Sequence, residues 1–173
     1  MPIDEAFEEV VKKLSNAKRK LDEREIFLSS KAGLDYALAD FDNIIDKAKE
    51  LAQSDVCRQA NLSFNFDLNN YQKPFSQEFT VNVPPGKLRI SWENKNANKL
   101  EHPSISFSVY NSDSSIKNLQ DAETYSFEQL PSGERGWVSV NQRISSEKVV
   151  LSADALANRW MNSLVISLYH PRT

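Results

Sequence analysis

The spacing of apolar residues changes once along the chain, near residue 56. Before that point apolar positions recur every three or four residues, and after it they recur every two. The first spacing is the heptad pattern of a coiled-coil helix, whereas the second is typical of a half-buried strand. The sequence therefore predicts an α+β protein, with a helical, coiled-coil-like segment over residues 1–56 and an antiparallel β-sandwich over residues 57–173.

The first predicted helix carries one continuous apolar stripe. Its seam is formed by Ile3, Phe7, Val10, Leu14, Ala17 and Leu21, which follow one another by four and three residues alternately. Soluble monomers rarely expose such a stripe to water. We therefore predict that Ile3, Phe7, Val10, Leu14 and Leu21 form an oligomerisation surface that gives a dimer or a trimer.

A second helical stripe follows a break at residues 29–33, Ser-Ser-Lys-Ala-Gly. Its apolar face is wider than the first, which indicates more than one neighbour. The face comprises Leu34, Leu38, Phe41, Ile45, Ala48 and Ala52, flanked by Ala37, Ile44 and Leu51. We favour an antiparallel helical hairpin that turns at the break; the alternative is a single long helix with a phase slip, which would associate between chains.

From Asn61 onward, about eight short segments alternate apolar and polar residues, separated by turn signals such as Pro84-Pro85-Gly86. Many short strands without long helices between them favour a sandwich of the jelly-roll kind. Ser152 is placed to cap a short helix before the last strand. The predicted inward residues are Leu62, Phe64, Phe66 and Leu68; Phe79, Val81 and Val83; Leu88, Ile90 and Trp92; Ile105, Phe107 and Val109; Tyr125 and Phe127; Val138 and Val140; Val149 and Leu151; and Leu164, Ile166 and Leu168.

Composition and charge narrow the classes of function. The chain is 40% apolar, enough for a core, and its net charge of −3 gives no general attraction to nucleic acid or anionic lipid. No apolar run is long enough to span a bilayer, and the acidic, periodic N-terminus is unlike a signal peptide. We therefore expect no nucleic-acid partner, no membrane insertion, and a cytoplasmic or particle-associated protein.

The residues that usually carry enzyme chemistry are scarce. One cysteine, Cys57, and two histidines, His102 and His170, offer no disulfide, zinc cage or catalytic triad, and four glycines do not build a phosphate-binding loop. We predict no cofactor, no metal site and no catalytic residue. A hydrolase that uses two carboxylates is the third option, with Asp67, Glu93, Glu101 and Glu128 as generic candidates.

One predicted surface feature could bind a ligand. If Val138 and Val140 point inward, Trp137 lies on the opposite face with Asn141 and Arg143, and Tyr110 likewise lies opposite Val109. Exposed aromatic rings beside a guanidinium group can stack on a sugar or anchor a protein. Tyr110, Trp137 and Arg143 are therefore the candidate binding surface, unless the helical segment or a loop covers Trp137.

These patterns predict a non-enzymatic protein–protein interaction or assembly module. In this interpretation the helices oligomerise or dock, and the sandwich presents a binding surface to a protein partner. The alternative is a lectin-like domain that binds a glycan through its exposed aromatic residues.

Overall fold

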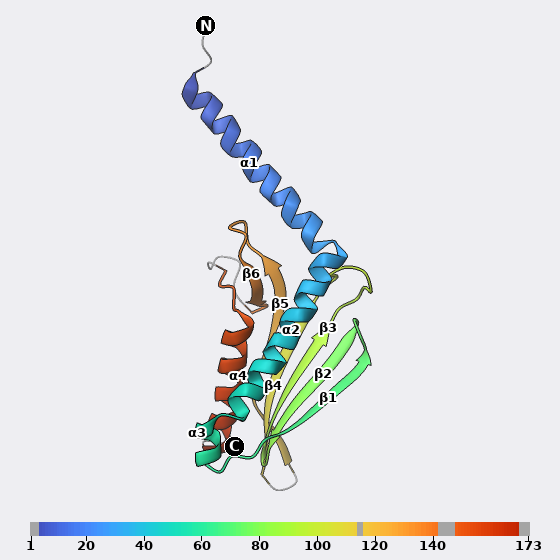
Figure 1. The fold of residues 1–173 in the computed structure, drawn as a ribbon, viewed down its shortest axis with the longest axis vertical. Coiled ribbons are helices and arrows are strands. Elements are labelled where there is room, and N and C mark those ends of the chain that lie inside the picture. Colours follow the sequence, from blue (N-terminus) through green and yellow to red (C-terminus); the bar gives the residue numbers. More distant parts are fainter. Residues whose placement is uncertain (1–3, 114–115, 142–147, 170–173) are drawn as a thin grey trace.

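The computed structural model describes residues 4–113, 116–141 and 148–169, which form an α+β fold (Figure 1). Within these described residues, three helices precede an antiparallel sheet and a fourth follows it. The helices are α1 (Glu5–Leu28), α2 (Lys31–Ala52), the short α3 (Asp55–Gln59) and α4 (Ala153–Tyr169). The strands are β1 (Asn65–Gln72), β2 (Ser76–Val83), β3 (Gly86–Glu93), β4 (Ser104–Asp113), β5 (Ile116–Gln129) and β6 (Arg135–Ser139).

The six strands form one sheet in which each strand pairs with the next along the chain. Pro84 and Pro85 connect β2 to β3, and Val83 pairs with Gly86 across this turn, as the sequence predicted. The alternation predicted for the central strands is confirmed, because Leu88, Ile90 and Trp92 of β3 are all buried. Each of them faces an apolar partner on β4 in the pairs Leu88–Val109, Ile90–Phe107 and Trp92–Ile105.

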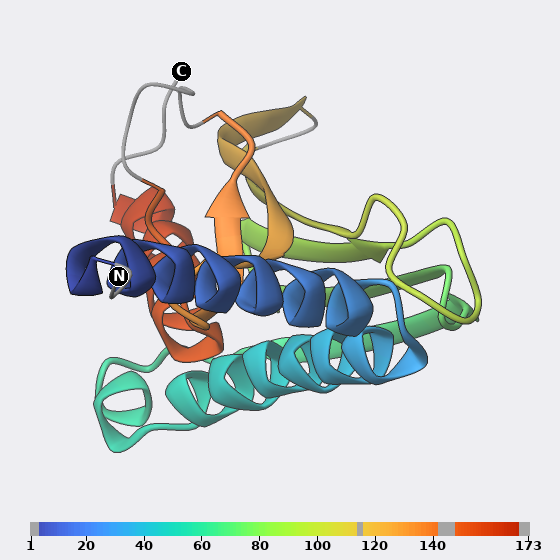
Figure 2. The ribbon, with the colours of Figure 1, turned by 90° about the horizontal axis from the view of Figure 1, so that it is seen from above.

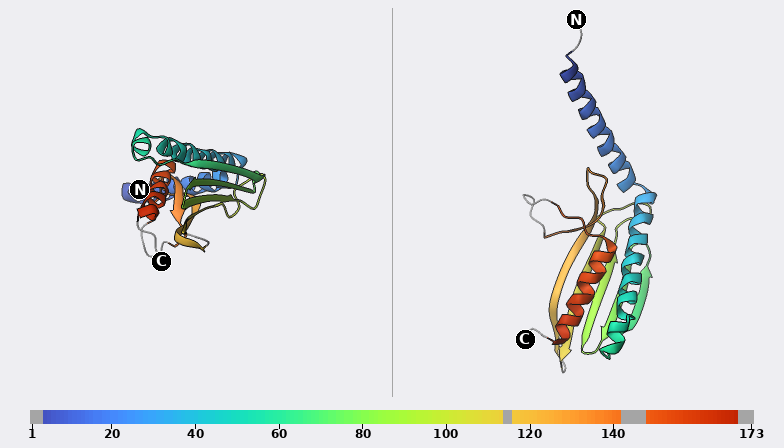
Figure 3. Two further views of the ribbon diagram at one scale, coloured as in Figure 1. Left: turned by 90° about the horizontal axis from the view of Figure 1, so that it is seen from below. Right: turned by 60° about the vertical axis from the view of Figure 1, so that its left-hand side comes forward.

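Helices α2 and α4 cover one face of the sheet (Figure 3). A sheet with one apolar face is stable once any apolar layer covers it, whether that layer is a second sheet or helices. Here the layer is helical, so the predicted sandwich of about eight strands is not confirmed. The core residues on the two helices are Leu34, Ala37, Phe41, Ile44, Ile45, Ala48 and Ala52 of α2, and Ala153, Leu156, Ala157, Trp160, Met161 and Leu164 of α4.

The closing strand predicted at Leu164, Ile166 and Leu168 is wrong, because these residues belong to α4. Ile166 is 58% exposed, whereas Leu156, Trp160 and Leu164 are buried. Those three residues are four apart and share one helical face with Leu168. The helical spacing therefore continues through residues where the sequence also shows a spacing of two.

The chain bends sharply between α1 and α2 (Figures 1 and 2). The side chain of Ser30 accepts a hydrogen bond from the backbone N–H of Gly33 and caps α2, while its hydroxyl donates to the carbonyl oxygen of Phe27. A Cβ atom on Gly33 would clash with that same carbonyl oxygen, so the bend requires glycine here. The structure thus shows neither the antiparallel hairpin nor a single long helix: α1 points away from the rest of the molecule.

Candidate functional site

Helix α1 projects as an arm from the rest of the described chain, which we call the body (Figure 1). The apolar stripe of this arm is uncovered. All 24 of its residues are described, and none of them is buried. Of the predicted oligomerisation residues, Phe7 is 62% exposed, Val10 62%, Leu14 70% and Leu21 46%. Ile3 lies outside the described residues. The four described residues therefore remain uncovered in the single chain.

The stripe is broader than the predicted seam. Val11, four residues after Phe7, is 48% exposed. Val11 lies beside Phe7 and Leu14 on the helix surface because residues three and four apart are neighbours. The sequence shows that Val11 is apolar and four residues after Phe7, but the strict alternation of four- and three-residue steps leaves Val11 out of the predicted seam.

Local interactions give α1 modest support of its own. Asp4 accepts a hydrogen bond from the backbone N–H of Ala6 at the start of the helix, and exposed ion pairs join Lys13 to Glu9 and Arg19 to Glu23. Exposed pairs of this type contribute about 0.3–0.5 kcal/mol each. Helical stability in proteins comes mostly from packing of the apolar face. The arm therefore lacks the main source of stability that helices of its length have.

The base of the arm is fixed to the sheet by a cluster of rings and one arginine. The guanidinium carbon of Arg135, at the start of β6, lies 3.6 Å from the centre of the Phe27 ring and 5.2 Å from that of Tyr36. Tyr36 in turn contacts Phe27 edge-on and Phe127 of β5, each with ring centres 5.8 Å apart. These contacts connect the base of α1 to the sheet. The sequence did not predict those of Arg135 and Phe127, because these residues lie about 100 positions from Phe27 and Tyr36.

A cleft of about 480 Å³ separates the second half of α1 from the turn between β5 and β6. Ala17 and Leu21 of the seam face it, and Pro131 borders it from the turn. The remaining lining residues are Lys13, Asn16 and Lys20. The apolar stripe is thus open along its first half and flanked by the body along its second.

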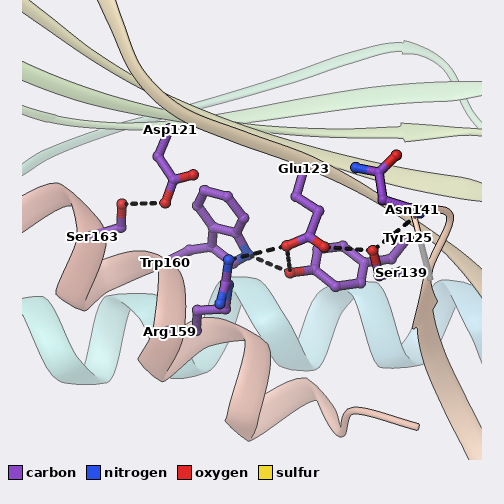
Figure 4. Close-up of polar contacts among 8 residues, drawn as sticks. All are labelled: Asp121, Glu123, Tyr125, Ser139, Asn141, Arg159, Trp160 and Ser163. Carbon is purple, nitrogen blue, oxygen red and sulfur yellow. Dashed lines mark hydrogen bonds and ion pairs between the residues drawn. The ribbon is translucent and has the colours of Figure 1, made fainter. Parts of the chain in front are cut away.

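A separate cluster of polar side chains lies between the sheet and α4 (Figure 4). The carboxylate of Glu123 accepts hydrogen bonds from the hydroxyls of Tyr125 and Ser139 and from Arg159, the last at 3.0 Å. The hydroxyl of Tyr125 also accepts a hydrogen bond from Trp160 Nε1 at 3.3 Å. Burial, together with the hydrogen bond to Glu123, raises the pKa of Tyr125 to about 12, so the phenol is neutral at physiological pH.

The hydrogen bonds of this cluster connect neighbouring elements and do not form a nucleophile–base pair. A hydroxyl nucleophile needs a base that is free to take its proton. Glu123 instead has its two oxygens engaged by three donors, one of which is the cation Arg159. The arrangement joins β5, β6 and α4, together with a neighbouring bond from Ser163 to Asp121 at 2.9 Å.

The predicted binding surface around Trp137 must be corrected. Trp137 is fully buried, and its Nε1 donates a hydrogen bond of 2.6 Å to Asp40 on α2. The reason is the phase of β6: Trp137 pairs with the inward Phe127, whereas Val140, predicted to face inward, is 55% exposed. Tyr110 is half-buried on β4, and Arg143 lies outside the described residues. The structure therefore does not bring the three together on one exposed face.

Asp40 is a half-buried acid at the interface between α2 and β6. Burial raises its pKa, and the hydrogen bond from Trp137 opposes that rise. Within the described ranges, no group of three His, Cys, Asp or Glu side chains is placed to hold a metal ion. None of the described helices is long and apolar enough to cross a membrane.

Comparison of the chain with protein-family models, with curated proteins and with solved structures gave no match.

Proposed function

We propose that this protein is a non-enzymatic interaction or assembly module that self-associates through the apolar stripe of α1. One observation carries the proposal: a helix of 24 residues exposes Phe7, Val10 and Leu14 and buries no residue of its own. A partner helix on this stripe would supply the packing that α1 lacks. Burying a side chain of the size of leucine or phenylalanine contributes about 1.5–3 kcal/mol.

The structure of the body supports the proposal that the body holds the arm in an accessible position. The anchoring of Phe27 by Arg135 and Tyr36 holds the arm away from the sheet, where its stripe stays accessible. The helix-covered sheet forms its own core without any residue from the first five turns of α1. The body is therefore complete without the arm, and the arm is free to join a second molecule.

The alternative of a glycan-binding domain loses its principal residue, since Trp137 lies in the core. We retain a protein partner, with a second copy of the chain as the first candidate.

Sedimentation equilibrium over a range of concentrations tests the proposal. We expect a mass of two or three times the 19.7 kDa of one chain at micromolar concentration, and a helical circular dichroism signal that decreases on dilution as the arm loses its partner. A mass of one chain at every concentration, with unchanged helicity, would reject self-association.

A further inference from the structure

A small cavity of about 290 Å³ lies between β5 and α4. Its lining includes Gln120 and Asp121 of β5, and Arg159, Asn162, Ser163 and Ile166 of α4. The residues of α4 are spaced by three and four positions, so they lie on one face of the helix. No described residue of α1 lines the cavity, which is therefore separate from the proposed association surface.

A β-bulge in β5 brings two neighbouring residues to the cavity. In a regular strand, adjacent side chains point to opposite faces of the sheet. Here consecutive residues of β4 pair with Asp121 and with Leu119, so that Gln120 between them is the extra residue of the bulge. Asp121 faces the helices because its partner on β4 is the buried core residue Val109. Gln120 nevertheless lines the same cavity, and bulges often redirect a side chain in this way next to a functional site.

Asp121 carries the uncompensated charge of this cavity. Among the described lining residues the only other charged group is Arg159, and its Nη2 already donates to Glu123 at 3.0 Å. Asp121 accepts a hydrogen bond of 2.9 Å from the neutral hydroxyl of Ser163, and no described lysine or arginine forms an ion pair with it. A carboxylate offers about four acceptor positions, so Asp121 has capacity for further donors.

We propose that this cavity binds the ammonium group of a small primary amine, with Asp121 as its counter-ion. An ammonium group brings one positive charge and three N–H donors, which match the charge and the acceptor positions of Asp121. Asn162 and Ile166 line the same cavity and offer it an amide oxygen and an apolar surface for the hydrocarbon chain. The volume lies near the lower limit of small-molecule pockets, about 300 Å³, so the chain is short.

The same residues disfavour an anionic ligand. Asp121 and Glu123 occupy neighbouring inward positions of β5, and Arg159 lies beside Glu123 (Figure 4). Arg159 also borders a second cavity, of about 190 Å³, which Glu123 lines as well. An anion bound to Arg159 would therefore approach carboxylates of its own sign, and like charges at short range repel each other.

Titration of the full chain with n-butylamine at low salt tests the site, with n-butanol as a neutral control of the same length. Backbone-amide NMR shifts report the position of binding. We expect n-butylamine to shift the amides around Asp121 and Ser163 in a saturable way, and n-butanol to leave them unchanged. D121N keeps an acceptor for Ser163 but loses the charge, so the dissociation constant should rise about fivefold or more. The matched control is D42N, at an exposed acid of α2, which should bind as the wild-type chain does.

A second variant should change the affinity in the opposite direction. R159Q leaves Glu123 without its cation beside the cavity, so n-butylamine should bind about two- to fivefold more tightly. The amide spectra of both variants away from the cavity show that they are folded.

Three results would overturn the proposal: no localised shifts at millimolar n-butylamine, a D121N variant that binds as tightly as the wild-type chain, or an R159Q variant that binds more weakly. None of these results bears on self-association, because the stripe of α1 takes no part in the cavity.

Discussion

The guanidinium carbon of Arg135 lies 3.6 Å from the centre of the Phe27 ring, which joins the last turn of α1 to the edge strand β6. This cation–π contact links the base of the arm to the sheet. The apolar stripe further along the arm stays uncovered.

Replacement of Arg135 by alanine should loosen the arm without unfolding the body. The lost cation–π contact is expected to lower the free energy of unfolding by about 0.5–1 kcal/mol. Hydrogen exchange of the amides around Phe27 should accelerate, because the rings there lose their cover. The matched control is R89A, which removes an exposed arginine paired with Glu78 at 2.8 Å on the sheet. If R135A and R89A change exchange around Phe27 equally, the contact between Arg135 and Phe27 does not hold the arm.

Replacement of Gly33 by alanine tests the bend between α1 and α2. Within an ordinary helix, glycine to alanine stabilises by about 1 kcal/mol. Here the new Cβ atom would clash with the carbonyl oxygen of Phe27, so we expect a net loss of stability of about 1–3 kcal/mol. Urea denaturation measures this change. The exposed Ala39 of α2 provides the control. The reverse change, A39G, should lower the stability by the ordinary helix-propensity difference between alanine and glycine, about 1 kcal/mol. A stabilised G33A variant would indicate that α1 and α2 form one continuous helix instead.

Replacement of Asp40 by asparagine should stabilise the protein at neutral pH. Burial raises the pKa of Asp40 above its ordinary value of 3.8, so the folded state binds this proton more tightly than the unfolded chain does. The resulting stability is complete below pH 3.8 and is lost as the pH rises through the folded pKa. Asparagine keeps an oxygen for Trp137 and carries no charge, so the advantage of D40N should grow as the pH rises from about 4 to about 7.

Urea denaturation of the wild-type chain and of D40N across this pH range measures the difference, with the exposed Asp42 on the same helix as the control in the variant D42N. An advantage of D40N that is constant with pH, or equal to that of D42N, would contradict the assigned role of burial at Asp40.

The sequence predicted the elements better than it predicted what covers them. The strands around Leu88 and Phe107 were readable because every second residue is apolar, and the helices around Leu14 and Phe41 because every third or fourth is. A row of inward apolar residues does not state whether a second sheet or a helix lies on it. The sandwich was therefore an inference about tertiary packing that alternation alone does not support.

The two local errors have different causes. At Leu164 the chain shows a spacing of two and a spacing of four at once, and the prediction followed the shorter spacing. In α4 the four-residue spacing of Leu156, Trp160 and Leu164 extends through the predicted strand. In β6 the burial of Gly136, Trp137 and Val138 in succession hides the alternation, so the phase that directs Trp137 toward Asp40 follows from the strand pairing instead.

The exposed stripe of α1 is the part of the candidate site that the sequence predicted most directly, and its four described residues are uncovered in the structure. The residues that fix its base were not predicted. Phe27, Tyr36 and Arg135 meet only through the tertiary fold, and no short-range pattern marks such a contact.

Sedimentation equilibrium of L14D beside S15D tests self-association through α1 most directly. Both variants add one negative charge to an exposed position of the arm, but Leu14 lies in the centre of the seam, whereas Ser15 is turned about 100° from Leu14, to the outer side of Val11. Burying an unpaired charge costs several kcal/mol, so L14D should sediment as a single chain of 19.7 kDa while S15D keeps the mass of the wild-type assembly. Equal masses for L14D, S15D and the wild-type chain would contradict the account.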